Sequence, residues 1–283
     1  MRDPFVMIND EIVPAERASL LFGDLAIQRG YGIFDYLKTL DNVPIFASAH
    51  LQRFFYSARQ LRLPIDKTEE ELLLLIHSLQ QKNNMPDSGI RLTLTGGYSP
   101  DGYGLASPNL VITQRPLDLP RPEQYQEGIR LITYPHKRQM ADVKTIDYLM
   151  AIWLQPLIRE SGADDVLYQQ DGILSECPRA NFFIVTADDT IVTPSRNILK
   201  GIIRGKVLEV ASKAFKTEER DIRMEELRTA KEAFITSTTK HIMPVFGIDG
   251  EVIGKGFPGE GVAGRISQWL WRELDTLVKD HIR

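Results

Sequence analysis

The sequence predicts an α+β protein built from two domains. The chain of 283 residues is long enough for two domains of ordinary size. Short segments rich in branched and aromatic residues are interspersed with segments of helical periodicity, and we find no internal repeat. Residues 115–124 carry three prolines and fit neither period, which is typical of a linker. We therefore expect a small N-terminal α/β domain at 1–115, a linker at 116–127 and a larger C-terminal domain at 128–283.

The N-terminal domain is expected to contain strands and two helices. Branched and aromatic residues bounded by Gly, Asn and Pro predict strands at 6–9, 35–40, 90–95 and 109–114. Residues 48–61 carry the apolar stripe of an amphipathic helix, and Ser48 is a candidate cap for it. Thr68 and Glu71 form a capping box that opens a second helix over residues 69–80.

The C-terminal domain is expected to mix strands, helices and tight turns. The strands are predicted at 129–134, 165–169, 182–185 and 233–236. Apolar residues at helical spacing predict a helix that opens at Lys144, a second helix after Gly201, and a long amphipathic last helix from Gly261. Residues 170–172 and 248–250 are predicted to be turns.

The composition favours a soluble enzyme or binding protein with a small-molecule ligand. A 43% apolar fraction with 25% charged residues indicates a substantial core, and a net charge of -4 gives no basic surface for nucleic acid. One cysteine and five scattered histidines without a ligand-spacing pattern argue against a disulfide framework and a metal site. Neither a signal-peptide pattern nor an apolar run of about 18 residues is found, so we expect a cytoplasmic protein without a membrane partner.

Four features together point to a phosphorylated carbonyl cofactor. A solitary lysine such as Lys144 is most often an ordinary solvated residue. About thirty residues later, however, Glu176 precedes a strand, and Gly201 then opens a helix whose first N–H groups are suited to a phosphate. A strand finally ends in four hydroxyl residues, Thr236 to Thr239. A lysine for a covalent C=N bond, a carboxylate and two anion-binding segments are what such a cofactor requires.

The same segments, in this order, resemble the fold-type IV pyridoxal-phosphate enzymes. The likeness runs from RGYGIFDYLK through HLQRFFYSA to FITSTTKHIMPV and so covers nearly the whole chain. This is the class IV aminotransferase family, with D-amino acid transaminases, branched-chain aminotransferases and aminodeoxychorismate lyases among its members. The resemblance implies pyridoxal 5'-phosphate as the cofactor and a C-terminal domain with a mixed, barrel-like sheet.

The resemblance also assigns roles to residues. Lys144 would form the Schiff base with the cofactor and act as general base and acid. Glu176 would pair with the pyridine nitrogen and keep it protonated. Arg53 matches the phosphate-binding arginine of the family, and Thr238 would give the phosphate a hydroxyl and a backbone donor.

One cofactor contact departs from the family pattern. Ile202 and Ile203 would offer backbone N–H groups to the phosphate, but the family commonly has threonine where this chain has Ile203. One hydroxyl donor is therefore missing. Arg179 is a candidate to replace this donor, and the alternative is that it is an ordinary arginine in a surface turn. Leu199 matches the residue that packs on the cofactor ring.

The substrate is expected to be held by two arginines. Gly96 stands where the familiar D-amino acid transaminase has its carboxylate-binding arginine. Arg91 is retained from the branched-chain pattern, and Arg29 would reach the neighbouring site of a homodimer, unless it instead pairs with Asp24 or Asp35. Phe34 and Thr239 are the remaining expected substrate contacts.

These expectations lead to a transaminase with 2-oxoglutarate as amino acceptor, and D-glutamate or D-alanine as the favoured donor. A branched-chain L-amino acid transaminase is the nearest alternative, followed by aminodeoxychorismate lyase, which needs no amino acceptor. A non-catalytic binding protein fits least well, because it would not require the lysine, the glutamate and the phosphate donors together.

Overall fold

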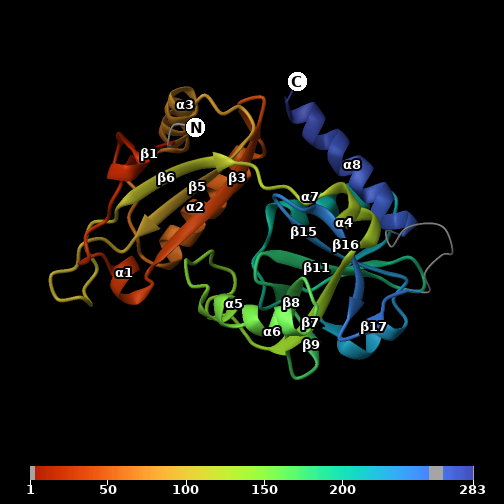
Figure 1. Cartoon of the computed structure of the whole chain (residues 1–283). Coiled ribbons are helices and arrows are strands. Elements are labelled where there is room, and N and C mark those ends of the chain that lie inside the picture. Colours follow the sequence, from red (N-terminus) through yellow and green to blue (C-terminus); the bar gives the residue numbers. More distant parts are fainter. Residues whose placement is uncertain (1–3, 255–263, 283) are drawn as a thin grey trace. The chain divides into compact units, whose positions relative to one another are not determined.

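The computed structural model describes residues 4–254 and 264–282, and these form two compact units (Figure 1). The first unit comprises residues 4–118, 143–147 and 281–282, and the second comprises the other described residues, 119–142 and 148–280. No helix in the described part of the chain has both the length and the apolar character needed to cross a membrane.

The first unit is built on an antiparallel sheet. Its strands are β1 Phe5–Ile8, β2 Glu11–Pro14, β3 Gly32–Leu40, β4 Val43–Pro44, β5 Ser88–Thr95 and β6 Leu110–Pro116. They pair in the order β2-β1-β6-β5-β3-β4. The longest strand pairings of the sheet are those of β3 with β5 and of β5 with β6.

Helices cover one face of this sheet (Figure 1). They are α2 Ala47–Gln60 and α3 Glu69–Asn83, and the unit also contains two short helices, η1 Ala15–Arg17 and α1 Leu25–Arg29. Phe54 of α2 and Ile76 of α3 are fully buried in one core with Ile33 and Ile90 of the sheet. Because side chains alternate along a strand, Phe34 and its same-face neighbours lie on the opposite face of the sheet.

A distant segment of the chain extends this sheet beside β3. The amide of Phe34 donates to the Lys144 carbonyl (2.9 Å), and the amide of Ile146 donates to the Gly32 carbonyl (3.1 Å). The predicted helix opening at Lys144 is therefore wrong, because these pairings hold the lysine in an extended segment. The helix α5, Leu149–Trp153, begins five residues later.

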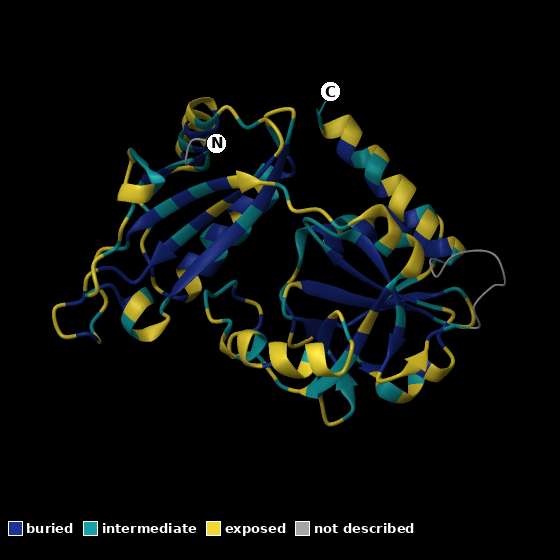
Figure 2. Ribbon diagram, viewed as in Figure 1, coloured by how far each residue is buried: buried dark blue, intermediate teal, exposed yellow. Residues whose placement is uncertain are grey.

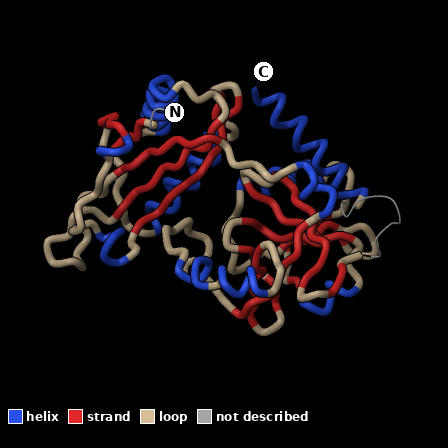
Figure 3. Tube along the Cα trace, viewed as in Figure 1, coloured by secondary structure: helices blue, strands red, loops and turns tan. Residues whose placement is uncertain are grey.

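The second unit contains a mixed sheet that curls into a half-barrel (Figure 3). Its strands are β7 Ile129–Pro135, β8 Asp165–Gln170, β9 Ile173–Leu174, β10 Glu176–Cys177, β11 Ala180–Val185, β12 Ile191–Thr193, β13 Thr217–Glu219, β14 Ile222–Arg223, β15 Glu232–Ser237, β16 His241–Ile248 and β17 Glu251–Val252. The main path runs β13-β12-β11-β15-β16-β7-β8-β9-β14, and β10 pairs with β11 while β17 pairs with β16.

Strands β11 and β15 lie at the buried centre of this sheet (Figure 2). The helices of the unit are α4 Pro122–Glu127, α5, α6 Gln155–Glu160, α7 Ile202–Ala211, η2 Met224–Arg228 and α8 Arg265–Ile282, of which residues 281–282 are grouped with the first unit. Buried side chains such as Phe182, Ile235 and Val245 form the core on one side of the sheet.

Local sequence signals predicted several boundaries correctly. The capping box of Thr68 and Glu71 is confirmed at the start of α3, and both predicted turns are confirmed by the β8–β9 and β16–β17 hairpins. Ser48 does not cap α2, because the helix already begins at Ala47 and its cap position is Phe46. The predicted start of the last helix at Gly261 lies outside the described residues, and α8 is described from Arg265.

Candidate active site

Lys144 lies beside an aromatic ring and an arginine in the first unit. Its Nζ atom is 4.6 Å from the centre of the Phe34 ring. The guanidinium carbon of Arg91 is 4.0 Å from the centre of the same ring. The Lys144 amide donates to the Ser57 hydroxyl of α2 (3.2 Å), which adds to the pairing with β3. Main-chain bonds therefore hold Lys144 in place while its amine lies beside the Phe34 ring.

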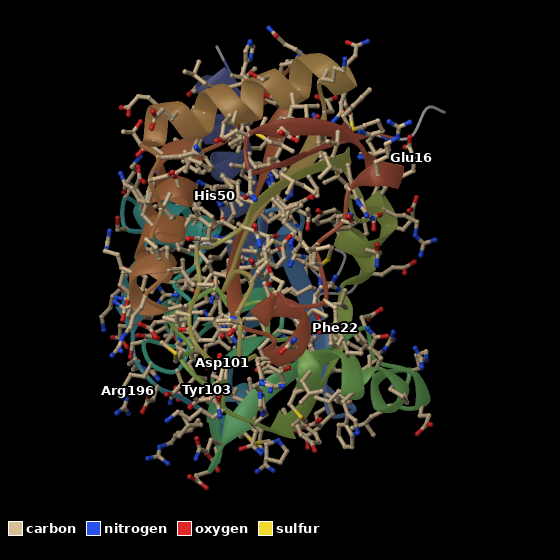
Figure 4. All side chains as sticks on the ribbon, turned by 90° about the vertical axis from the view of Figure 1, so that its left-hand side faces the viewer. Glu16, Phe22, His50, Asp101, Tyr103 and Arg196 are labelled. Atoms are coloured by element: carbon tan, nitrogen blue, oxygen red, sulfur yellow. The ribbon has the colours of Figure 1, made fainter. Side chains whose placement is uncertain are left out.

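Arg53, the predicted phosphate arginine, is oriented by a buried carboxylate. Asp35 is fully buried and accepts hydrogen bonds from Arg53 Nε and from one terminal nitrogen of the same guanidinium, both at 2.8 Å. His50 Nδ1 lies 2.8 Å from Asp35 Oδ1 (His50 is labelled in Figure 4). The Arg53 guanidinium is thus held by a planar, two-point ion pair.

Burial and charge act in opposite directions on this cluster. Burial alone raises the pKa of Asp35, but the charge of Arg53 and the hydrogen bonds from His50 and Arg53 outweigh it and hold that pKa well below its ordinary value. Burial also lowers the pKa of His50, against the opposing effect of Asp35. A lowered pKa favours the neutral imidazole, and the tautomer with a proton on Nδ1 is the one that can donate to Asp35.

Arg29 lies at the C-terminal end of the short helix α1. The helix begins with the buried Asp24, whose side chain accepts from the Ala26 amide, and ends at Gly30 in the left-handed conformation. The exposed Arg29 guanidinium donates to the Gln28 carbonyl (3.1 Å). Within the described residues of this chain, Arg29 forms no ion pair with Asp24 or Asp35.

Glu176 is the centre of a second cluster, which lies in the second unit. Its Oε1 atom accepts from Arg138 (2.7 Å), and its Oε2 atom accepts from the Leu199 amide (2.9 Å) and from Asn181 Nδ2 (3.3 Å). Asn181 also donates to the Leu199 carbonyl (2.7 Å). Burial on strand β10 and the hydrogen bonds from Arg138, Asn181 and the Leu199 amide fix the orientation of this carboxylate.

The first turn of α7 lies against the same cluster. A Cβ atom on Gly201 would sit 2.0 Å from Asn181 Oδ1, so glycine is required for this close approach. Ile202 and Ile203 follow as the first two residues of the helix, and Gly201 makes no side-chain cap. The first N–H groups of a helix have no partner within it, which suits them to bind an anion.

The remaining predicted contacts lie at turns of the second unit. Thr238 and Thr239 are half-buried in the turn that joins β15 to β16. Arg179 is exposed in the turn between β10 and β11. The structure thus places Phe34, Arg91 and Lys144 together in the first unit, and Glu176, Leu199 and the start of α7 together in the second.

Three supporting residues were not identified from the sequence as parts of the site. No recognisable motif surrounds Arg138, and its spacing of six residues from Lys144 matches neither the helical nor the strand period. Asn181 follows Glu176 by five residues, and the hairpin between them could have suggested their pairing. Asp35 was considered as a partner of Arg29, but the structure pairs it with Arg53.

The residues present fit pyridoxal phosphate. In the second unit, a fixed carboxylate suits a protonated ring nitrogen, the Gly201 turn leaves N–H groups for a phosphate, and the buried hydroxyl of Thr236 has no hydrogen-bond partner within the described residues. In the first unit, the Lys144 amine is suited to react with a carbonyl group, and the Arg53 guanidinium is suited to bind an anion.

Comparison with known proteins supports this interpretation. Residues 32–248 match the family model for amino-transferase class IV. The chain is 28% identical to a D-alanine aminotransferase of Bacillus licheniformis over 261 residues, which covers 90% of this chain and 92% of that protein. It is 30% identical to a provisionally named branched-chain-amino-acid aminotransferase of Methanocaldococcus jannaschii over 267 residues, with coverage of 90% and 91%.

Solved structures show the same fold. The branched-chain amino acid aminotransferase of Escherichia coli superposes with a TM-score of 0.87 at 23% identity, covering 98% of this chain and 94% of that one. A second branched-chain amino acid aminotransferase, from T.th. and solved with pyridoxamine 5'-phosphate, gives a TM-score of 0.88 at 23% identity, with coverage of 99% and 95%. Because the family model spans most of the chain, the chain belongs to the class IV aminotransferases, which are pyridoxal-phosphate-dependent transferases.

Proposed function

We propose that this aminotransferase moves the amino group of a D-amino acid, D-glutamate or D-alanine, to 2-oxoglutarate. The observation that carries the proposal is the contact of Arg91 and Lys144 with one ring, that of Phe34. The predicted catalytic amine and an exposed guanidinium thus lie beside the same side chain. A guanidinium at this position is suited to bind a substrate carboxylate through two parallel hydrogen bonds while the amine acts at the adjacent α-carbon.

The proposed roles follow from the surroundings of each group. When bound, pyridoxal phosphate supplies the carbonyl that accepts the amine and the electron-poor ring that stabilises the carbanion. The Nζ amine of Lys144 removes the proton from the substrate α-carbon. The Glu176 carboxylate, fixed by Arg138, Asn181 and the Leu199 amide, presents negative charge to the ring nitrogen. Arg53 in the first unit, and the N–H groups of Ile202 and Ile203 in the second, are the groups that would donate to the phosphate.

We further propose a homodimer in which Arg29 of one copy serves the site of the other. Large apolar side chains are exposed around α1 in the first unit: Phe22 is 78% and Tyr103 is 85% exposed (Figure 4). Leu21, Ile27 and Leu105 are also exposed. Large exposed apolar side chains that gather on one surface are typical of protein contact surfaces. Arg29 lies on the same helix as Ile27. The one cysteine, Cys177, is buried and forms no disulfide, which fits the cytoplasm as the proposed location.

A kinetic comparison tests the substrate. The purified holoenzyme is assayed with D-glutamate, D-alanine and L-leucine as donors, with 2-oxoglutarate or pyruvate as acceptor. Replacing Arg91 by isoleucine is expected to reduce kcat/KM roughly 10- to 100-fold, because a charge-assisted carboxylate contact is lost. Arg115→Ile removes an exposed arginine from the neighbouring strand β6 and is the matched control. Equal kinetics for the Arg91 and Arg115 variants would contradict the proposal.

A mixing experiment tests the shared site. Arg29→Ile and Lys144→Ala are each expected to be nearly inactive with D-glutamate. In a mixed dimer one site has both native residues, so random reassociation is expected to restore about a quarter of the wild-type activity. No recovery on mixing, with exchange of subunits verified, would place Arg29 outside the neighbouring site.

A branched-chain aminotransferase is the second candidate, because one relative with that provisional name is 30% identical. Activity on L-leucine with none on D-amino acids would assign the chain to that class. Release of pyruvate from aminodeoxychorismate without an amino acceptor would instead reveal a lyase.

A further inference from the structure

Three side chains form a row across adjacent strands of the second unit. Glu176 on β10 is the register partner of Asn181 on β11, and Asn181 is the register partner of Thr236 on β15. Directly opposed residues of antiparallel strands project from the same face of a sheet. The hydrogen bond between Asn181 and Glu176, and the close approach of Gly201 to Asn181, identify this face as the one that carries the start of α7.

The last member of the row has an unusual environment. Thr236 is 2% exposed, and its Oγ1 atom has no hydrogen-bond partner among the residues that the structure describes. Leaving a buried hydroxyl unpaired is unfavourable, and such groups are rare in folded proteins. A ligand that formed a hydrogen bond with this hydroxyl would remove the cost of leaving it unpaired.

The start of α7 lacks a hydroxyl that a phosphate site would use. Ile203 is 3% exposed and carries no polar side-chain atom, and Gly201 contributes no cap. The backbone N–H groups of the first turn are therefore its donors. Each terminal oxygen of a phosphate bound there can accept more than one hydrogen bond, so a nearby side-chain hydroxyl would add a donor.

We propose that Thr236 Oγ1 donates to the phosphate of pyridoxal phosphate and supplies the bond that Ile203 cannot. This inference rests on the proposed cofactor-binding role of Glu176. Thr236 is two strands from Glu176, roughly 10 Å in the hydrogen-bonding direction. With the ring nitrogen at Glu176, a phosphate bound at the start of α7 would lie on the face of the sheet that carries this row. Thr238 follows Thr236 by two residues and extends the same group of hydroxyls into the turn.

The test compares cofactors with and without the phosphate. Thr236→Val keeps the side-chain shape but removes the hydroxyl, and Thr236→Ser keeps the hydroxyl. The dissociation constants of pyridoxal phosphate and of pyridoxal are measured by titrating the apoenzyme. For the valine variant we expect roughly a 10-fold or larger loss of affinity for pyridoxal phosphate, because a bond to a charged group is lost, and less than about a two-fold change for pyridoxal. Thr236→Ser should bind both as the wild type does.

Two further measurements separate binding from structure. Thr236→Val should raise the Tm of the apoenzyme, because a buried unpaired hydroxyl is replaced by a methyl group, and should reduce the increase of Tm that pyridoxal phosphate causes. Ile203→Thr added to Thr236→Val should restore most of the lost affinity by returning a hydroxyl to the first turn of α7.

Specific results would overturn the inference. Equal losses for pyridoxal phosphate and pyridoxal, or a lower apoenzyme Tm with unchanged affinity, would make Thr236 a structural residue. A loss of phosphate-dependent affinity in Arg179→Ala but not in Thr236→Val would assign the extra contact to the arginine. If the wild type binds no pyridoxal phosphate, both the proposed function and the Thr236 assignment fail. If the wild type binds it and Thr236→Val binds it equally well, only the Thr236 assignment fails.

Discussion

Replacing Asp35 by asparagine removes the negative charge that balances Arg53 while keeping the shape of the side chain. Asp35 accepts two bonds from Arg53 and lies within bonding distance of His50, and its side chain has no exposed surface. Removing one partner of a buried, hydrogen-bonded ion pair leaves the other charge uncompensated and typically costs about 3 to 5 kcal/mol. Because Arg53 is 11% exposed and water can reach part of it, we expect about 3 kcal/mol for the first unit at pH 7.

The assay can distinguish the two units. The three tryptophans, Trp153, Trp269 and Trp271, all belong to the second unit, so their fluorescence reports on that unit, whereas far-UV circular dichroism reports on both. Urea unfolding followed by circular dichroism should show the destabilisation. Asp66→Asn is the matched control, because that side chain is 92% exposed and its contact with Lys67 is long, at 3.8 Å.

The pH dependence provides an independent check. Since the folded-state pKa of Asp35 is depressed below its ordinary value of 3.8, its contribution to stability is present above about pH 4 and is lost as the pH falls through the folded-state pKa. The difference in unfolding free energy between wild type and Asp35→Asn should therefore shrink in acid. Two results would refute the reasoning. One is a loss of unfolding free energy below about 1 kcal/mol in Asp35→Asn at pH 7, and the other is a difference between the two proteins that stays constant down to about pH 2.

Three further substitutions follow from local contacts. Arg138→Leu should destabilise the second unit by about 3 kcal/mol in urea unfolding and weaken cofactor binding, because the buried Glu176 loses its ion pair with the Arg138 guanidinium. An unchanged unfolding transition would show that this ion pair is dispensable. Gly89→Ala should lower stability by about 1 to 3 kcal/mol, since its Cβ would lie 1.9 Å from the Tyr36 hydroxyl, and a neutral effect would mean that the ring moves without cost. Gly205→Ala, within α7 and with open space around it, should instead raise stability by about 0.5 to 1 kcal/mol, and a lower Tm would contradict this.

Much of the secondary structure could be predicted because its signals are local. The capping box at Thr68, the strand patterns and the two hairpin turns each depend on a few adjacent residues. The helix predicted at Lys144 was wrong because a periodic apolar pattern cannot reveal competing strand pairing with a distant segment. Here the carbonyl of Lys144 bonds to the amide of Phe34, far earlier in the chain, and the helix starts only at Leu149.

The sequence by itself determined the family and the kinds of chemical group available, because motifs record residue types and their order. Only the tertiary structure decided how those groups are supported. Arg53 is balanced by Asp35 across 18 positions and Glu176 by Arg138 across 38, and Thr236 lies in the row with Glu176 through strand register. Such partners are selected by the packing of strands and helices rather than by neighbouring residues, so no local pattern could have identified them.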